Sequence, residues 1–287
     1  MRILITGATG FIGQKLLKRL TDQHHTLAIH ARKQLHEEDT NVRVFSGELN
    51  QFQKEIISFS PEFVFHLAGS SIYPKNAEEE VELWSANVLY GNTLLSIIKE
   101  IPGLVFVNFT TSLAYDGTEL YPFSYYALTK ANFVQSLHYF TRYYNVRVFN
   151  LILYTVYGKG DKTKRALNYI LDSLDASEPI SMSPGEQLMD FIHVEDVIGL
   201  CLQLLENKPK KKIEEIHVGT GRGITLKDAA RLIELLSKQK TNIDFGAIPY
   251  RKEEKMVNVA LVENNRFWKS SIPFEKGIES LLLNTNR

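Results

Sequence analysis

Hydrophobic and polar positions at the start of the chain predict a strand followed directly by a helix. Residues 3–5 form a continuous apolar run, and apolar residues then recur over positions 11–20 at the spacing of one helix face. Three glycines, Gly7, Gly10 and Gly13, occupy the junction between the two segments. The pattern therefore predicts a strand, a tight turn and an amphipathic helix.

The same alternation of strand and helix continues through the first half of the chain. The predicted strands are apolar on both sides, which is typical of a parallel sheet covered by helices on both faces. They are Arg2–Thr6, Thr26–Ala31, Val42–Phe45, Phe63–His66, Val105–Asn108 and Arg147–Ile152. Helices are expected to begin near Gly10, Gln51, Ala77, Ser124, Lys164, Val194 and Thr225. This order predicts an α/β fold with a doubly wound parallel sheet of the Rossmann type.

The pattern becomes less regular after about residue 153, where glycine-rich segments separate shorter elements. We therefore expect a dinucleotide-binding domain over residues 1–153, with returning segments near 190–218. Residues 154–287 are expected to form a smaller substrate-binding lobe. In open α/β sheets ligands bind at the carboxyl ends of the strands, so the ligand cleft is expected there.

Composition narrows the classes of function. The 287 residues include 33 lysines and arginines and 33 aspartates and glutamates, so the formal net charge is zero. Such a chain has no overall attraction to nucleic acid or to an anionic membrane, and no apolar run approaches the ~18 residues of a membrane span. The eight histidines show no metal-ligand spacing. The single cysteine, Cys201, lies in an apolar segment and is interpreted as a core residue, and with no secretory signal the expected location is cytoplasmic.

The glycines at positions 7, 10 and 13 suit the binding of a pyrophosphate. Gly7 would permit the turn, Gly10 would let the backbone approach the anion, and Gly13 would allow the helix to pack closely on the strand. The N-terminus of the helix would then present free N–H groups to the phosphates. The spacing is G-x-x-G-x-x-G, so a glycine-rich turn in another kind of α/β protein is the alternative.

Two further groups of residues could carry chemistry. Tyr126 and Lys130 are four residues apart in a helix-like stretch, so both side chains share one face, where an ammonium lowers the pKa of a phenol. Thr111 and Ser112 follow the strand Val105–Asn108, where hydroxyls could hydrogen-bond a carbonyl. Taken singly, each group could equally be an ordinary surface pair or a strand-terminating cluster.

The order and spacing of these motifs resemble the short-chain dehydrogenase/reductase superfamily, and its extended branch of NAD(P)-dependent sugar-nucleotide epimerases, dehydratases and reductases most closely. The resemblance spans almost the whole chain. It includes the segments 61–69, 87–95, 156–160, 190–196 and 217–221. It implies that Tyr126 is the general acid/base, that Lys130 holds the nicotinamide ribose and tunes Tyr126, and that Ser112 hydrogen-bonds the reacting oxygen, with Thr111 as the alternative.

The resemblance also implies a set of cofactor-binding residues. They are Gly7, Thr9, Gly10, Phe11, Ile12, Gly13, Arg32, Lys33, Glu48, Leu49, Leu67, Ala68, Gly69, Asn87, Tyr126, Lys130 and Tyr154. Relatives that prefer NAD carry an acidic residue at the end of the second strand, where this chain has Ala31 followed by Arg32 and Lys33. A cationic pair favours a 2′-phosphate, so the expected cofactor is NADPH/NADP. A solvated basic loop with mixed specificity is the alternative.

Departures from the family pattern narrow the expected reaction. Leu113 and Ala114 replace the Asp-Glu pair that 4,6-dehydratases place after the catalytic hydroxyl, and Cys201 lies too far along the chain to be a catalytic cysteine. What remains is one-way hydride transfer from NADPH to a ketone. Residues 181–187 and 245–254 resemble the 4-ketoreductases that finish deoxy- and dideoxyhexoses. This resemblance implies reduction of the C4 ketone of a CDP- or dTDP-activated deoxy sugar, in the synthesis of bacterial surface polysaccharide precursors such as the O-antigen. The alternatives are a 4-epimerase that retains NAD and a non-catalytic NADP-binding sensor.

The contacts expected for the substrate are altered as well. Thr155 stands where the family has asparagine, and Met189 stands where it has the arginine that holds the diphosphate. Lys162, Lys164, Arg165 or Arg251 could replace that cation. The residues expected to bind the nucleotide sugar are Ser70, Thr111, Ser112, Thr155, Arg165 and Arg251. A homodimer formed through the helices at Asn87 and Ser124 is expected by analogy alone.

Overall fold

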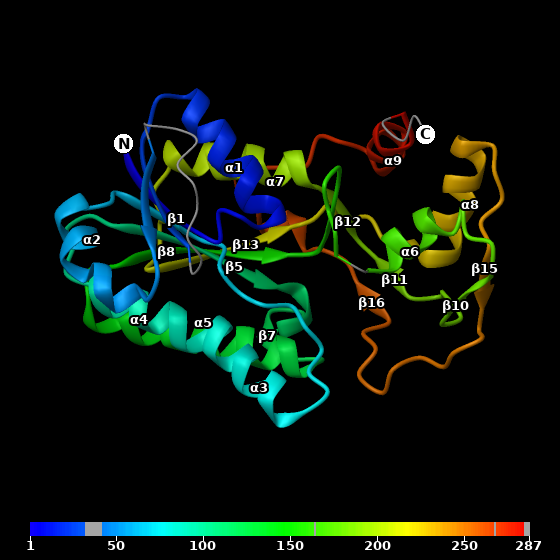
Figure 1. The fold of residues 1–287 in the computed structure, drawn as a ribbon, viewed down its shortest axis with the longest axis horizontal. Coiled ribbons are helices and arrows are strands. Elements are labelled where there is room, and N and C mark those ends of the chain that lie inside the picture. Colours follow the sequence, from blue (N-terminus) through cyan, green and yellow to red (C-terminus); the bar gives the residue numbers. More distant parts are fainter. Residues whose placement is uncertain (32–41, 164, 267, 284–287) are drawn as a thin grey trace. The chain divides into compact units, whose positions relative to one another are not determined.

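A computed structural model describes residues 1–31, 42–163, 165–266 and 268–283 (Figure 1). The chain divides into two compact units. The first consists of Met1–Ile152 and Ile198–Ile216, and the second of Leu153–Val197 and His217–Arg287. Each unit has its own hydrophobic core and is described by itself below.

A seven-stranded sheet forms the centre of the first unit (Figure 1). Its order is β13-β8-β5-β4-β1-β2-β3, and the pairs β1–β2, β1–β4, β2–β3 and β4–β5 are parallel. The strands are β1 (Arg2–Thr6), β2 (Thr26–Ala31), β3 (Val42–Ser46), β4 (Phe63–His66), β5 (Val105–Thr111), β8 (Arg147–Leu153) and β13 (Ile213–Val218). The order reverses its direction of growth after β1 and β4, which is the arrangement of a doubly wound Rossmann-type sheet.

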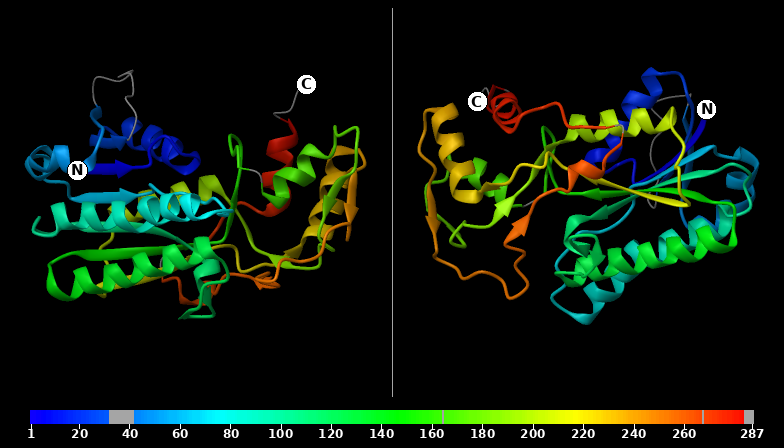
Figure 2. Two further views of the ribbon diagram at one scale, coloured as in Figure 1. Left: turned by 60° about the horizontal axis from the view of Figure 1, so that its bottom comes forward. Right: turned by 180° about the vertical axis from the view of Figure 1, so that it is seen from behind.

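Helices cover both faces of this sheet, and Figures 1 and 2 show α1 and α7 on one face and α4 and α5 on the other. They are α1 (Phe11–Asp22), α2 (Gln53–Phe59), α3 (Ala77–Trp84), α4 (Tyr90–Ile98), α5 (Tyr125–Tyr143) and α7 (Val194–Leu205), with 3₁₀ turns at η1 (Leu49–Phe52) and η3 (Ser112–Ala114). Side chains of α2, α4 and α5 pack with those of the central strands in one core. Burial of each such leucine, isoleucine or phenylalanine contributes about 1.5–3 kcal/mol.

The helix between β4 and β5 contains one wide turn. Helix α3 runs into a π-helical segment, η2 (Ser85–Leu89), which runs directly into α4. Asn76 begins the helix by accepting the Glu79 N–H at 2.9 Å. A π segment holds one extra residue per turn and often occurs at functional sites. Here it carries Asn87, whose side chain is buried.

The second unit is built from short strands and three helices among its described residues. The helices are α6 (Ala166–Asp172), α8 (Leu226–Ser237) and α9 (Phe274–Leu283), and η4 (Val262–Asn264) is a 3₁₀ turn. The strands are β9 (Thr155–Tyr157), β10 (Ile180–Met182), β11 (Leu188–Met189), β12 (Phe191–His193), β14 (Ile224–Thr225), β15 (Ile243–Phe245) and β16 (Val257–Asn258). They pair as β10–β15, β14–β11–β16 and β12–β9. Its core gathers apolar side chains from α6, α8 and α9 around Tyr157 and Phe191.

The predicted α/β fold is confirmed, and local chemistry explains where its elements begin. Ser124 and Thr225 accept N–H groups of Ala127 and Asp228, so each caps the helix that follows it. The helix expected near Gln51 starts instead with the 3₁₀ turn η1. The helix expected near Lys164 begins at Ala166, and Lys164 itself lies outside the described residues.

Several elements were not predicted, among them one strand of the central sheet, the short strands of the second unit and the last described helix. Strand β13 was missed because Glu214 and Glu215 interrupt its apolar pattern. Two neighbouring side chains meet the hydrogen-bonding needs of the Glu215 carboxylate. Tyr115 Oη donates to its Oε1 at 2.7 Å, and Asn150 Nδ2 donates to the same atom at 3.0 Å. Helix α9 (Phe274–Leu283) was not predicted either. A small hairpin, β6 (Tyr115–Asp116) with β7 (Glu119–Leu120), also follows η3.

Candidate active site

The glycine turn between β1 and α1 leaves no room for side chains. Gly7 has a φ of +72°, and a Cβ on it would lie 2.5 Å from the Ala68 nitrogen. A Cβ on Gly13 would lie 2.1 Å from the Gly7 carbonyl oxygen, so α1 can approach β1 only with glycine there. Gly10 caps α1 without a side-chain hydrogen bond. The first N–H groups of α1 are therefore not capped by a side chain, which suits an anion.

A cavity of about 560 Å³ lies beside this turn within the first unit. Eight of the predicted cofactor residues line it, namely Gly7, Thr9, Gly10, Glu48, Leu49, Leu67, Ala68 and Gly69. The cavity extends from the glycine turn toward the carboxyl ends of β2 and β3 and along the helix that contains η2. The glycine turn and the N-terminus of α1, which no side chain caps, together fit the pyrophosphate and one nucleoside of a dinucleotide.

The remaining predicted cofactor residues are distributed more widely. Phe11, Ile12 and Gly13 form the first turn of α1 rather than the cavity wall. Arg32 and Lys33 lie outside the described residues, although Ala31 before them lines the cavity.

Helix α5 carries the predicted catalytic pair. Tyr126 and Lys130 are one turn apart near its N-terminus, just after the cap Ser124. The Lys130 side chain is buried, and its Nζ donates to the Phe109 carbonyl on β5 at 3.0 Å. Burial lowers the pKa of Lys130 to about 8. Within the described part of the chain, the Lys130 ammonium is therefore held by one backbone acceptor, the Phe109 carbonyl.

The turn that carries Ser112 is tied to the segment before α5. Tyr121 N donates to the Ala114 carbonyl at 3.0 Å, and Phe123 N donates to the Leu113 carbonyl at 2.9 Å. Thr111 Oγ1 accepts the Leu113 N–H at 3.3 Å and so caps the turn. These bonds hold the Ser112 turn beside the N-terminus of α5.

A loop after β4 connects the cavity to Lys130. Asn87 Oδ1 accepts the Ser70 N–H at 2.8 Å, and Asn87 Nδ2 donates to the Ser70 carbonyl at 2.9 Å and to Thr129 Oγ1 at 2.9 Å. A Cβ on Gly69 would lie 2.7 Å from Asn87 Oδ1 and 3.2 Å from Lys130 Nζ. The structure thus brings Gly69, Ser70, Asn87 and Lys130 together.

The other predicted residues lie in the second unit. Tyr154 Oη hydrogen-bonds His217 Nδ1 at 3.0 Å, and Thr155 N donates to the Asp190 carbonyl at 3.0 Å. Arg165 directly precedes α6 and makes no side-chain capping bond to it, but its Nη1 donates to the Val156 carbonyl at 3.5 Å. Arg251 is exposed.

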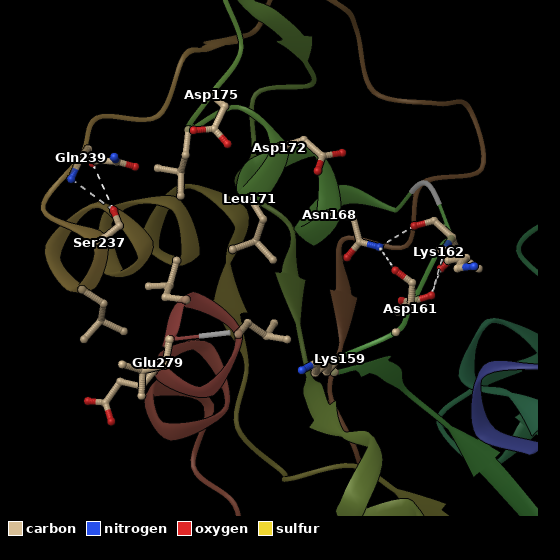
Figure 3. A pocket seen from close by; sticks show the side chains of 18 residues that line it. Lys159, Asp161, Lys162, Asn168, Leu171, Asp172, Asp175, Ser237, Gln239 and Glu279 are labelled. Carbon is tan, nitrogen blue, oxygen red and sulfur yellow. Dashed lines mark hydrogen bonds between the residues drawn. The ribbon is translucent and has the colours of Figure 1, made fainter. Parts of the chain in front are cut away.

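The second unit also holds a cavity of about 1010 Å³ (Figure 3). It is lined by the loop 158–163 and by parts of α6, α8 and α9. In Figure 3, Asn168 points toward the backbone of Asp161, to whose carbonyl it donates at 3.4 Å, and Lys162 lies beside this pair. None of the residues predicted to bind cofactor or substrate lines this cavity, although Lys162 was considered as a replacement cation.

Three features expected from composition can be compared with the structure. Cys201 is buried in α7, and burial raises the pKa of its thiol, so it has the character of a core residue. Among the described residues no group of three or more histidine, cysteine, aspartate or glutamate side chains could hold a metal ion. No described helix is both long and apolar enough to cross a membrane.

Sequence reasoning missed several residues of the first cavity, because they carry no motif. His30 and Tyr90 line it and hydrogen-bond each other, His30 Nδ1 to Tyr90 Oη at 2.7 Å. Glu82, Ser85, Ala86, Leu89 and Thr93 line it along the helix. A lone histidine inside an apolar strand gives no sign of which face it occupies. The one available signal was its place next to Ala31.

Both the sequence and the fold of this chain are similar to those of known proteins. A model of the NAD dependent epimerase/dehydratase family matches residues 3–219. CDP-abequose synthase from Salmonella typhimurium is 28% identical over 98% of this chain and 97% of that protein. CDP-abequose synthase from Yersinia pseudotuberculosis is 25% identical over 89% of this chain and 91% of that protein. Among solved structures, UDP-glucose 4-epimerase from Thermus thermophilus in complex with NAD has a TM-score of 0.84 at 20% identity and covers 100% of both chains, which shows the shared fold.

Proposed function

This chain belongs to the NAD dependent epimerase/dehydratase family, and we propose that it reduces the C4 ketone of a nucleotide-activated deoxy sugar with NADPH. The proposed substrate is a CDP- or dTDP-4-keto-6-deoxyhexose or 3,6-dideoxyhexose, and the proposed role is in bacterial surface polysaccharide synthesis. The near full-length similarity to proteins named CDP-abequose synthase supports this substrate class. A cytoplasmic location and a homodimer belong to the same proposal.

One observation carries the proposal: the buried ammonium of Lys130 lies one turn from Tyr126 on α5. The bound nicotinamide would supply the hydride. Tyr126 Oη donates a proton to the alkoxide that develops at C4, and the Lys130 charge stabilises the phenolate left behind. Ser112 hydrogen-bonds the same oxygen, because its turn is held beside the N-terminus of α5.

Use of NADPH rather than NADH rests on the end of β2. Ala31 lines the cavity where an acidic side chain would bind a ribose 2′-hydroxyl. Arg32 and Lys33 follow it in the sequence and suit a 2′-phosphate. Glu48, which also lines the cavity, is proposed to contact the adenine.

Other reactions of the family are less well supported. Leu113 and Ala114 lie in the η3 turn after Ser112, so no carboxylate pair follows that hydroxyl to assist dehydration. The buried Cys201, with its raised pKa, is unsuited to covalent or acid/base chemistry. A 4-epimerase remains the second candidate, because the family model includes epimerases and the same Tyr126–Lys130 pair would serve that reaction.

The proposed substrate contacts are the residues that the sequence predicts, and each unit is considered by itself. In the first unit they are Ser70, Thr111 and Ser112, of which Ser70 is held through its backbone by Asn87. In the second unit they are Thr155, Arg165 and Arg251. Since Met189 in β11 cannot pair with a phosphate, an arginine from this set is the proposed diphosphate contact.

The nucleotide bound to freshly purified protein tests the proposal first. A reductase that exchanges cofactor should be purified largely empty, bind NADPH more tightly than NADH, and consume NADPH with a CDP- or dTDP-4-keto sugar. Retained NAD together with interconversion of C4 epimers would establish the epimerase instead. Tight NADP binding without turnover on any 4-keto sugar would support a sensor.

Replacement of Tyr126 by phenylalanine tests the chemical step. We expect Y126F to lower kcat by about 10²–10⁴-fold, the usual contribution of a general acid/base, with the NADPH dissociation constant within about twofold of the wild type. Steady-state kinetics and fluorescence titration measure the two effects. Tyr125, its neighbour on α5, provides the matched control, and Y125F should keep most of the activity. Wild-type turnover by Y126F would remove Tyr126 from the mechanism.

A further inference from the structure

A largely buried polar cluster lies beside the Ser112 turn, and neither the sequence motifs nor the proposed mechanism uses it. This cluster, here called the Asn150 cluster, consists of Asn108 on β5, Asn150 on β8, Glu215 on β13 and Tyr115 in β6. The strands β5, β8 and β13 are neighbours in the sheet, and all four residues belong to the first unit (Figure 1). Asn108, Asn150 and Tyr115 are at most 2% exposed. Burial of such groups is costly unless they are hydrogen-bonded, and when they are, the cluster makes its surroundings rigid.

Asn150 is the centre of this cluster. Its Oδ1 accepts a hydrogen bond from Asn108 Nδ2 at 2.8 Å, and its Nδ2 donates to Tyr115 Oη at 2.9 Å and to Glu215 Oε1 at 3.0 Å. Tyr115 Oη donates in turn to Glu215 Oε1 at 2.7 Å. Burial and the Glu215 carboxylate raise the pKa of Tyr115, so its phenol keeps the proton that this bond uses. The Tyr115 side chain is therefore fixed by two partners.

Tyr115 connects the cluster to Ser112. The η3 turn consists of Ser112–Ala114, and the N–H of Tyr115, the next residue, donates to the Ser112 carbonyl. Tyr115 thus holds Ser112 through its backbone and the sheet through its phenol. Because the backbone of the turn determines where the Ser112 hydroxyl lies, the fixed phenol of Tyr115 limits how far that hydroxyl can move.

Asn108 connects the same cluster to Lys130. It directly precedes Phe109, whose carbonyl accepts a hydrogen bond from Lys130 Nζ at 3.0 Å. Asn150 therefore binds β5 just before the acceptor of Lys130 and binds Tyr115 just after the Ser112 turn. One buried side chain fixes both ends of the segment 108–115, which contains Ser112 and holds the Lys130 ammonium.

We propose that Asn150, Tyr115 and Glu215 are positioning residues that fix the Ser112 hydroxyl relative to the Lys130 ammonium for the reaction at C4. The inference rests on the proposed function in assigning Ser112 to the reacting oxygen. The three residues act through Ser112 and take no part in the proton or hydride transfer. Misplacement of a catalytic group by about 1 Å can cost about 10²-fold in rate, so a cluster outside the site can govern turnover.

Three substitutions and a control test the bond between Tyr115 and Glu215. Y115F removes only the phenol hydroxyl. E215A removes its acceptor at an exposed position, and E215Q keeps an oxygen that can accept the same bond. Y143F, at an exposed tyrosine at the end of α5, is the matched control. The measurement is steady-state kinetics of the C4 reaction that the wild type catalyses, whether reduction or epimerisation.

We expect Y115F and E215A each to lower kcat by about 10–30-fold, with the KM for the nucleotide sugar within about twofold of the wild type. E215Q should stay within about threefold, and Y143F should match the wild type. The double variant Y115F/E215A should be no slower than the slower single variant, because both substitutions break the same bond. An unchanged kcat in Y115F and E215A, or equal losses in E215Q and E215A, would overturn the inference.

Amide hydrogen exchange separates this inference from the proposed function, because it needs no substrate. In Y115F we expect about tenfold faster exchange at the N–H of residue 115, bonded to the Ser112 carbonyl, and at the Phe123 N–H, bonded to the Leu113 carbonyl. Amides of α8 in the second unit should keep their rates. E215A gives the same comparison if Y115F does not fold.

Unchanged exchange at both amides would overturn the inference whatever the kinetics show. Faster exchange in a protein whose wild type catalyses no C4 reaction would leave the role of the Asn150 cluster in holding the turn intact, and the proposed function alone would fail.

Discussion

Lys130 in the first unit and Asp190 in the second are both buried ionisable groups, yet their surroundings differ sharply. Lys130 Nζ donates to one backbone carbonyl, that of Phe109. Asp190 is 0% exposed and accepts the N–H groups of Thr220, Gly221 and Ala260 together with the Thr220 hydroxyl, at 2.7–3.1 Å. A charge buried for structure receives many partners, whereas one buried with a single partner is placed for a ligand or a reaction.

The same contrast extends to neighbouring groups. In the second unit, Asp196 accepts two N–H groups and a hydroxyl from Ser271 and Ile272 at 2.6–3.0 Å. In the first unit, burial and the nearby Lys130 charge lower the pKa of His66 to about 3. In the first unit, burial of Lys130 and His66 therefore carries a desolvation cost at the candidate site. In the second unit, the buried carboxylates of Asp190 and Asp196 hold loops in place through hydrogen bonds.

Replacement of Lys130 by methionine should give the largest effect on activity and none of the usual cost in stability. We expect K130M to lower kcat by about 10²–10³-fold, because the charge that supports Tyr126 is lost. The lowered pKa of Lys130 corresponds to about 3 kcal/mol of unfavourable burial at pH 7, which offsets the lost hydrogen bond to Phe109. The free energy of unfolding, from urea titration, should be unchanged or higher.

A loss of more than about 2 kcal/mol in K130M would show that Lys130 is a structural group like Asp190. The contrast between Lys130, buried for reaction, and Asp190, buried for structure, would then be wrong.

Replacement of Asp190 by asparagine should produce the opposite result. The new amide group would face N–H donors of the loops at Thr220 and Ala260, so we expect a loss of about 3 kcal/mol in the free energy of unfolding. Urea titration of D190N measures it. Asp228, an exposed carboxylate in the first turn of α8, supplies the control, and D228N should cost about 0.5 kcal/mol or less. Equal losses in the two variants would contradict the contrast.

Acid sensitivity should reveal His66. Below pH 6.5 the unfolded chain protonates this ring, but the folded chain does not until about pH 3, so stability falls as the pH falls through this interval. Between pH 6.5 and pH 5 the expected loss is about 2 kcal/mol. H66N keeps a partner for Thr6 Oγ1, which lies 2.9 Å from Nδ1, and lacks the titrating ring.

Urea titrations at pH 7 and pH 5 test this prediction. The difference between the two pH values should be smaller in H66N than in the wild type by about 2 kcal/mol, whatever the absolute stability of the variant. Equal differences would mean that His66 titrates normally in the folded chain.

The sequence predicted those parts of the molecule that follow from local patterns. Apolar runs located six of the seven strands of the central sheet, and glycine spacing located the turn at Gly7, because steric exclusion around that turn permits only glycine. The motif order also proposes Ser112, Tyr126 and Lys130 as catalytic residues, and these roles stay predictions. The full burial of Lys130 and its bond to Phe109 could not be predicted, since they depend on how α5 packs against β5.

Long-range pairing accounts for what the sequence did not predict. Strand β13 contains two glutamates and becomes a sheet strand only because Tyr115 and Asn150, far away in sequence, satisfy Glu215. His30 acquires its hydrogen bond to Tyr90 from a helix sixty residues later. Such contacts leave no periodic trace along the chain.

The π-helical segment Ser85–Leu89 matters for aligning this chain with homologues and for engineering it. It is equivalent to a one-residue insertion in an otherwise continuous helix. Deletion of one residue there would restore a regular helix and leave the two halves close to their present orientation, because the wide turn absorbs the extra residue. Tyr90, which follows the segment, would still reach His30, whereas the contact of Asn87 with Ser70 would change, because Asn87 lies inside the segment. A homologue with a regular helix at this point therefore needs its alignment gap inside these five positions, and length here should be treated as part of the site.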